Sequence, residues 1–429
     1  MNNMNKIVIS LFLTLITYSF NSLAEKIDVV WTGFSINADY KDLEKSAYYT
    51  NLLLQRYKSS QNIIDATLLS ELNLNKFNNI NIFSGTEQLS VETSKIALSV
   101  FLDQELFEEF KLPDDDCKNI NLTECYIYSI NNYYQIIFFD FSKMTFIKAI
   151  PFQNIFISDP LAKLDESQKV DLLELSYQNG NWLNGGSNIQ SDNKNETSFI
   201  EILNNAQINT YYDSYVGINP NKNGFSLNKE QIKDFVPDYI YENIHLLKRH
   251  VANTFLGELA LKNNIVIVPY FEGVAIGNKI RGKYADREEA YEITIPEPDF
   301  FIDMEIRGFV KKKFKEDENV KGLTWYVYGA GINLKFYEPL LNKVYLDIKM
   351  TKADYKKIPD ILNLNKTNEF VNIINLTYKP LAIEFSRITN KEISNNERIN
   401  WLKKITKNST NIDDIVVFRE FLDRIKSTQ

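Results

Sequence analysis

The chain has 429 residues, of which 44% are hydrophobic, so it can bury real cores and is not an intrinsically disordered protein. Its 48 basic and 56 acidic residues give a formal charge of −8, which repels phosphate backbones and argues against nucleic acid as a partner. The aromatic fraction of 13% favours β-rich structure.

Residues 1–24 have the pattern of a secretory signal peptide. Lys6 precedes the apolar run 7–20, and small residues at Ser22 and Ala24 mark a cleavage site before Glu25. The run is shorter than the roughly 20 residues that span a bilayer, and no cysteine near the cut could carry a lipid. We therefore expect an exported protein without a transmembrane segment, in the periplasm or, alternatively, outside the cell. Without Lys6 the mature chain has 47 basic and 56 acidic residues, a charge of −9.

Cys117 and Cys125 are the only cysteines of the chain. In an oxidising compartment, two cysteines that close so short a loop predict a local disulfide bond. A redox or metal pair is the alternative, but the spacing is not CxxC and no histidine lies nearby in the sequence.

In the first part of the mature chain, 25–158, we predict an α/β module. A buried strand (26–34) precedes a helix (43–58) and a short strand (80–83), whereas 96–112 has features of both strand and helix. Strands at 126–130, 134–140 and 144–151 follow, and the last two form a hairpin.

The polar, glycine-bearing stretch 159–228 is interpreted as a connector with helical pieces. A second α/β module is predicted at 229–352. It has a helix over 229–262 with a break at Pro237, a buried strand at 265–270, and strands at 300–309, 324–337 and 344–350. The remainder, 353–429, is predicted to be helical. The expected fold class is therefore α+β, with two small mixed modules, antiparallel hairpins and a helical C-terminal region.

Two pairs of segments suggest an internal repeat. Segments 135–150 and 332–348 both read strand, aromatic residue with an acid, turn with lysine, strand. Upstream, 27–34 and 265–273 both place a buried strand before an aromatic residue and a glycine.

Residues 265–270, 299–309, 329–338 and 343–349 place a buried strand before an antiparallel set that ends in a hairpin with an acid before the turn. This order resembles the small α/β module of the TolB amino-terminal domain, which curli-secretion lipoproteins and some flagellar-ring periplasmic proteins share. The resemblance covers about 238–350 and extends to 26–152, as a tandem arrangement. The lipid-bearing cysteine of the curli proteins is absent here, and the turn reads Pro339-Leu340-Leu341-Asn342 in place of the usual Thr-Gly pair. The resemblance implies binding and assembly in the bacterial envelope, with no catalytic residues to transfer.

The two histidines do not predict a metal site. His245 and His250 lie five residues apart on one predicted helix, about 140° around its axis, so they cannot share one metal ion. A di-iron site would need a second Glu-x-x-His, which the chain lacks. We predict no cofactor.

Glu297 and Asp299 are the candidate acid pair, because acids beside Phe300 and Phe301 suit a sugar site. The competing interpretation is a polar entry to a strand. A lysine run, Lys311, Lys312, Lys313 and Lys315, is the candidate surface-binding site for anionic headgroups or an acidic partner. The acids at 316–318 largely neutralise this run, and a solvated hairpin tip is the alternative.

Together these patterns favour an exported, non-catalytic envelope accessory or assembly protein that binds other envelope proteins or outer-membrane components. The alternatives are a secreted glycan hydrolase with a carboxylate pair and a secreted factor that binds a host surface.

Overall fold

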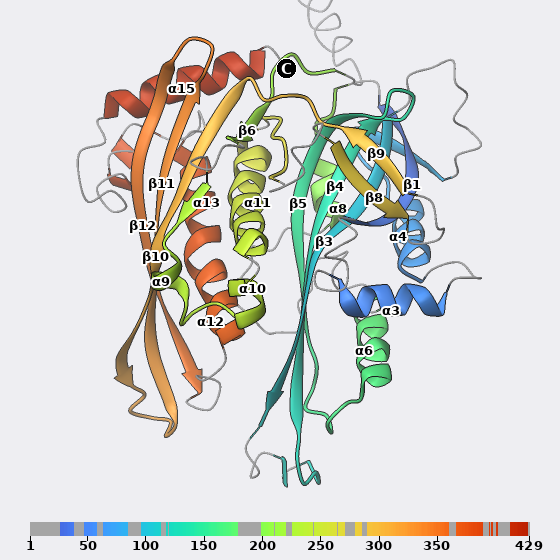
Figure 1. Ribbon diagram of the computed structural model, residues 1–429, viewed down its shortest axis with the longest axis vertical. Helices are drawn as coiled ribbons and strands as arrows, with labels where there is room; N and C mark the ends of the chain where they lie inside the picture. The colour runs from blue at the N-terminus through green and yellow to red at the C-terminus, as the bar shows by residue number, and fades with distance from the viewer. Residues whose placement is uncertain are drawn as a thin grey trace, which may run out of the picture.

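The computed structural model describes residues 26–37, 47–57, 63–84, 96–112, 117–118, 120–178, 199–209, 211–219, 225–242, 244–263, 265–270, 279–284, 290–359, 366–388, 394, 396–397, 400–401 and 412–427. The predicted signal peptide, 1–24, lies outside the described residues. The expected α+β class is confirmed, because two mixed sheets alternate with two groups of helices in a stack of four layers (Figure 1).

Sheet 1 has seven strands in the order β2-β1-β3-β4-β5-β9-β8, and β8 also pairs with β1, so the sheet closes on itself. Its strands are β1 (Ile27–Asn37), β2 (Ile80–Ser84), β3 (Ile96–Lys111), β4 (Tyr126–Asp140), β5 (Thr145–Ile157), β8 (Lys279–Tyr284) and β9 (Ala290–Thr294). The helices α3 (Tyr48–Arg56), α4 (Ile63–Leu74), α6 (Glu166–Gln178) and α8 (Phe199–Asn205) complete its core.

Sheet 2 has the order β12-β11-β10-β6, and β7 extends the β6 side by pairing with β10. Its strands are β6 (Val216–Ile218), β7 (Phe225–Leu227), β10 (Phe300–Glu316), β11 (Leu323–Glu338) and β12 (Lys343–Pro359). The helices that follow β7 and β12 are α9 (Lys229–Ile232), α10 (Asp238–Glu242), α11 (Ile244–Asn263), α12 (Lys366–Ile373), α13 (Lys379–Ile388) and α15 (Ile412–Ser427), with a π-helical turn, η3 (Ile374–Tyr378), between α12 and α13.

The two sheets differ in how many of their faces are covered. Along β4 nearly every side chain is buried, because α3 and α6 lie on one side of sheet 1 and α11 lies on the other. Along β11 burial alternates for most of the strand, as expected of a strand with one face on a core and one face in solvent. In the described part of the chain, the helices α9 to α13 and α15 pack on the inner face of sheet 2, and none of them covers its outer face (Figure 1).

The topology repeats along the chain. β3, β4 and β5 are consecutive antiparallel neighbours, and so are β10, β11 and β12. β1 runs parallel to β3 as β6 does to β10. Ile267 forms a parallel bridge to Val216 of β6, in the place where β2 pairs with β1. The order strand, helices, strand, three antiparallel strands, helices therefore occurs twice, and we name these units repeat 1 (27–205) and repeat 2 (216–427).

Irregularities in the ladders fall at matching positions. The β3–β4 register shifts between Leu102 and Gln104, and the β10–β11 register shifts between Ile306 and Gly308, seven residues into each strand in both cases. The registers of the β4–β5 and β11–β12 hairpins also shift, each three residues before the turn, after Phe138 and after Phe336. Since a bulge re-aims all later side chains, matching bulges set equivalent faces in the two repeats.

Both hairpins also close with the same turn. Residues 141–144 and 339–342 each form a four-residue turn after an acid, and the last turn residue is left-handed, with φ of 49° at Met144 and 48° at Asn342. The predicted similarity of 135–150 and 332–348 thus corresponds to a shared hairpin geometry. The described part of segment 265–273, residues 265–270, occupies the place of β2, not that of 27–34.

The segment 265–270 was expected to be a strand, but among the described residues it forms only the bridge at Ile267. It is nevertheless extended and buried on both sides. Val266 and Val268 join the core of sheet 1, whereas Ile265 and Ile267 join the core of sheet 2. Its apolar composition therefore reflects a position between two cores.

Several element boundaries differ from the sequence prediction. Lys311–Lys315 continue β10, because this strand pairs with β11 as far as Glu316. β12 continues to Pro359, beyond the predicted module end at 352, because it pairs with β11 along its whole length. β8 and β9 lie within 229–352 but pair with β1 and β5 of sheet 1. Beyond β12, the described residues of the C-terminal region are mainly helical, as predicted.

Candidate functional site

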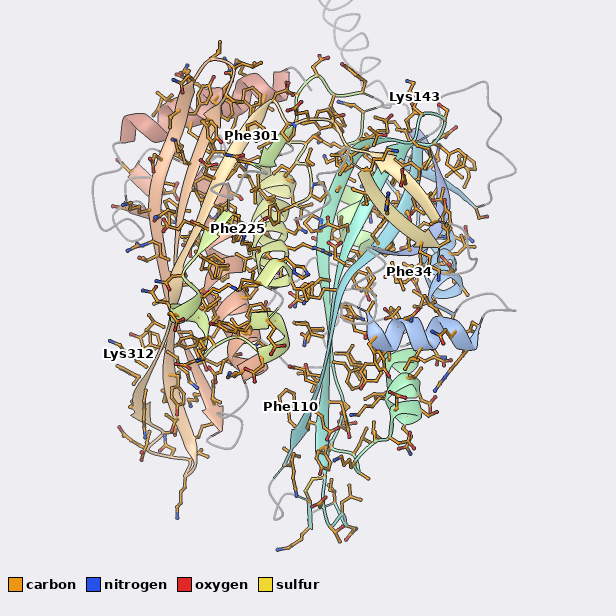
Figure 2. The ribbon with its side chains drawn as sticks, viewed as in Figure 1. Phe34, Phe110, Lys143, Phe225, Phe301 and Lys312 are labelled. Carbon is orange, nitrogen blue, oxygen red and sulfur yellow. A yellow bond between two sulfur atoms is a disulfide. The ribbon has the colours of Figure 1, made fainter. Side chains whose placement is uncertain are left out.

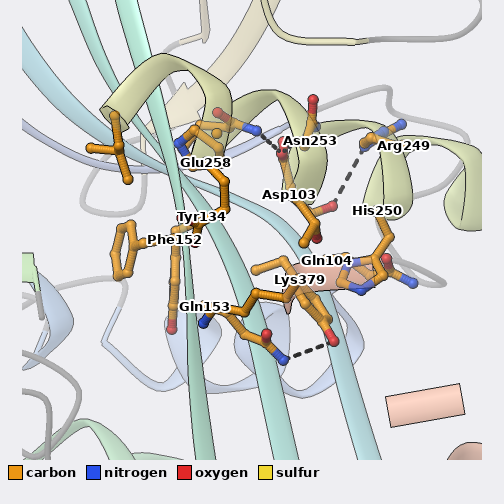
Figure 3. A pocket seen from close by; sticks show the side chains of 16 residues that line it. Asp103, Gln104, Tyr134, Phe152, Gln153, Arg249, His250, Asn253, Glu258 and Lys379 are labelled. Carbon is orange, nitrogen blue, oxygen red and sulfur yellow. Dashed lines mark hydrogen bonds between the residues drawn. The ribbon is translucent and has the colours of Figure 1, made fainter. Parts of the chain in front are cut away.

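A polar cavity lies between sheet 1 and α11 (Figure 3). Asp103, Gln104, Gln135 and Gln153 line it from the sheet, and Arg249, His250 and Asn253 line it from the helix. Its volume is about 70 Å³, well below the roughly 300–1,000 Å³ of small-molecule sites. The cavity is therefore suited to water molecules and not to a substrate.

Asp103 joins the two sides of this cavity. Its carboxylate accepts a hydrogen bond from Gln135 Nε2 at 2.9 Å and a longer one from Asn253 Nδ2 at 3.4 Å. Asn253 Oδ1 in turn accepts from the backbone N–H of Tyr270 at 3.0 Å. The Asp103 side chain is therefore held by polar groups from both repeats.

His250 is buried beside the cavity and remains neutral. Its ring lies edge-on to Tyr133, with centroids 3.9 Å apart, and 5.4 Å from the ring of Phe370. Burial in this environment lowers the pKa of His250 to about 3. Its Nε2 has no hydrogen-bond partner in the described part of the chain, and the same holds for Gln104 Nε2 and Gln135 Oε1.

Glu105 is a second buried titratable group that the sequence did not single out. Its carboxylate accepts from the backbone N–H groups of Tyr49 and Thr50 and from the Thr50 hydroxyl, at the start of α3. Burial nevertheless outweighs these three donors and raises the pKa of Glu105 to about 7. The raised pKa of Glu105 arises only in the fold, which brings β3 under the first turn of α3.

A large groove lies on sheet 2, at the open end of the stack. Its volume is about 930 Å³, at the upper end of the range for ligand sites. The central strand contributes Gly329 and Gly331 to its lining, and these leave the floor without side chains. Neighbouring positions carry Val310, Val327 and Ala353, so this part of the floor is apolar, and the Arg307 side chain lies beside Gly331.

One wall of the groove is fixed by a chain of contacts. Glu384 of α13 forms an ion pair with Lys352 of β12 and accepts a hydrogen bond from Trp401 Nε1 at 3.1 Å. Arg387, one turn further along α13, is exposed and also lines the groove. The nearby acid Glu397 has a lowered pKa, mainly because Ser394 donates hydrogen bonds to it, with a smaller effect of Arg387.

Arg307 and Lys312 supply positive charge to the groove from β10. Both side chains are exposed, and Figure 2 shows Lys312 on the outer side of sheet 2, away from the helices. Such a concentration of cations in a protein with a net charge of −8 favours an anionic ligand or partner.

The predicted lysine run is divided by the strand. Lys312 lines the groove, but Lys311 points to the inner face, where its Nζ lies 2.6 Å from Glu369 in a largely buried ion pair. Lys313 pairs with Glu316 at 2.6 Å, and Lys315 is exposed. The alternation of a strand therefore leaves one of these four lysines at the groove.

The predicted acid pair does not lie at either hollow. Glu297 and Asp299 are exposed, and neither lines the cavity or the groove. Asp299 Oδ2 accepts a hydrogen bond from the backbone N–H of Tyr215 at 2.9 Å, which fixes the approach to β10. This contact corresponds to the structural interpretation, a polar entry to a strand.

The predicted disulfide bond is confirmed. Cys117 and Cys125 are bonded, with Cα atoms 5.3 Å apart, in the loop between β3 and β4. In the described ranges we find no group of three or more His, Cys, Asp or Glu side chains arranged to hold a metal ion. Within the same ranges, none of the helices combines the length and apolar character needed to cross a membrane.

Comparison with models of known protein families finds none that matches this chain. A search of curated proteins likewise finds no relative.

Proposed function

We propose that this chain is an exported, non-catalytic accessory or assembly protein of the bacterial envelope, which binds an anionic envelope component at the sheet 2 groove. The observation that carries the proposal is the groove itself. An acidic protein presents a glycine-floored hollow of about 930 Å³ with Arg307, Lys312 and Arg387 around it. Such a surface suits binding, and its lining has one acid, Glu384, which is already paired.

Two further observations support the proposal. The first 24 residues have the signal-peptide pattern, and the Cys117–Cys125 disulfide suits an oxidising compartment. The order of strands in repeat 2 resembles the TolB amino-terminal module, which implies envelope assembly. In the structure, however, the strand 265–270 of that resemblance is an extended segment with one bridge.

The test is fractionation of the native host, followed by crosslinking and mass spectrometry of the mature chain. We expect the chain in the periplasmic or outer-membrane fraction, crosslinked to envelope proteins. Arg307→Glu should weaken these crosslinks, whereas Lys321→Glu, the same charge change at the exposed turn between β10 and β11 and outside the groove, should not. Free soluble protein without stable crosslinks would contradict the proposal.

A further inference from the structure

Equivalent faces of the two sheets differ in what covers them. On sheet 1, the face that carries Asp103, Tyr133 and Pro151 is covered by α11. The helix lies so close that a Cβ added to Gly257 would come within 2.2 Å of Pro151 Cγ. His250 and Asn253 lie one turn apart on α11. His250 packs on Tyr133, and Asn253 donates a hydrogen bond to Asp103.

The corresponding face of sheet 2 is the groove. Matching the bulges of β3 and β10 aligns Asp103 with Arg307 and Leu106 with Val310. The ladders then align Tyr133 with Gly331, since Gln104 pairs with Tyr133 and Gly308 pairs with Gly331. The groove therefore occupies, on repeat 2, the place that α11 occupies on repeat 1.

The charges at these equivalent positions are opposite. Asp103 corresponds to Arg307, and Glu108 corresponds to Lys312. On sheet 1 the helix that covers the acids brings a cation: Arg249 Nη1 lies 3.5 Å from the backbone oxygen of Asp103. A helix that covered the bases of sheet 2 would need acids in the same place.

We propose that the groove is the docking site of an amphipathic α-helix from a partner protein, with an apolar stripe on the Gly329–Gly331 floor and acidic residues facing Arg307 and Lys312. The glycines suit a helix because they let its backbone approach the sheet closely, as Gly257 does against Pro151. Helix-in-groove recognition of this kind uses apolar anchors one helical turn apart. This inference rests on the proposed binding role and specifies the partner's chemistry.

The chain itself supplies the probe, because α11 is a helix that already fits the equivalent face. Two labelled peptides with the α11 sequence 244–263 are synthesised and held helical by a staple, one unchanged and one with Arg249→Glu. Fluorescence anisotropy measures their binding to the mature protein. We expect the Arg249→Glu peptide to bind at least about tenfold more tightly than the unchanged peptide, since it places an acid opposite Arg307. A scrambled peptide of the same composition should not bind.

Protein variants test the location. Gly329→Val should abolish binding by filling the floor, and it should leave the fold intact because a Cβ there meets only ordinary contacts at 3.7 Å. Arg307→Glu should reverse the preference, so that the unchanged peptide binds better. Lys321→Glu, which reverses one positive charge at the exposed turn between β10 and β11 and outside the groove, is the matched control and should keep the original preference.

Equal binding of the two helical peptides, no binding of either, or equal effects of Arg307→Glu and Lys321→Glu would overturn the helix inference. If neither peptide binds but the crosslinks in cells still depend on Arg307, the proposed function stands and only the inference of a helical partner is wrong. If the peptides bind as expected but no envelope protein is crosslinked, the groove binds a helix and the proposed envelope function is wrong.

Discussion

His250 allows a quantitative test of how the two repeats are packed together. The side chain is 5% exposed, between Tyr133 of sheet 1 and Phe370 of α12. We replace it with glutamine, which keeps a polar side chain but cannot become a cation. Because a buried imidazole resists protonation, we expect the free energy of unfolding to fall in mild acid for wild type and not for His250→Gln.

The magnitude follows from the two pKa values. An unfolded histidine has a pKa of about 6.5, and burial lowers the folded value to about 3. As the pH falls, the unfolded chain therefore takes up the proton first, and the stability present above pH 6.5 is lost progressively down to pH 3. Each pH unit in this window is worth about 1.4 kcal/mol, so at pH 5.5 the loss is about 1.4 kcal/mol.

The assay compares the free energy of unfolding in urea at pH 7.5 and pH 5.5 for wild type and His250→Gln. Glu105 shifts stability in the opposite direction over this range, but it is common to both proteins and cancels in the difference. NMR of ¹³Cε1-labelled histidine gives an independent reading, because the chain has only two histidines and the variant assigns the His250 signal.

We expect the His250 signal to stay at its neutral position down to pH 5. A His250 signal that titrates near pH 6.5, or an equal loss of stability in wild type and His250→Gln, would refute the buried environment of this side chain. The packing of α11 on sheet 1 would then need revision.

Three further predictions concern stability. Burial raises the pKa of Glu105 to about 7, above the unfolded value of about 4.5, so the free energy of unfolding falls as the pH rises from 4.5 to 7. In urea unfolding, wild type should therefore lose about 2 kcal/mol more than Glu105→Gln between pH 5.5 and pH 8. Gly257→Ala should destabilise by about 1–3 kcal/mol, because its Cβ would lie 2.2 Å from Pro151 Cγ, and adding Pro151→Ala should restore part of the loss; additive losses would show that the contact is not the cause. Replacing Cys117 and Cys125 by serine should lower the free energy of unfolding by about 2–3 kcal/mol, with an unchanged urea transition as the contrary result.

Elements with a local signature could be predicted from the sequence. The hairpins around 141–144 and 339–342 have apolar strands on both sides of a polar or proline-bearing turn, and both exist. The disulfide followed from two cysteines in a short loop. The strand character of 96–112 could not be settled locally, because Glu105, Glu108 and Glu109 are buried or paired by other elements and read as helix-like in isolation.

Features that depend on distant segments could not be predicted. Residues 265–270 read as a strand because both sides are apolar, but the two sides belong to different cores. The groove arises where three strands lie side by side, so Gly329, Arg307 and Ala353 meet only after pairing. The charge swap between Asp103 and Arg307 becomes visible only when the bulges align the repeats.

The β8–β9 hairpin has a consequence for the timing of folding. It follows β5 by more than a hundred residues, yet it bridges β1 and β5 and closes sheet 1. During synthesis the strands up to Ile157 emerge with both edges unprotected until Thr294 has been made, which at about 5–20 residues per second takes roughly 7–27 s. Unpaired edges over that interval invite aggregation, so the nascent first half depends on being held unfolded or shielded until the second half arrives.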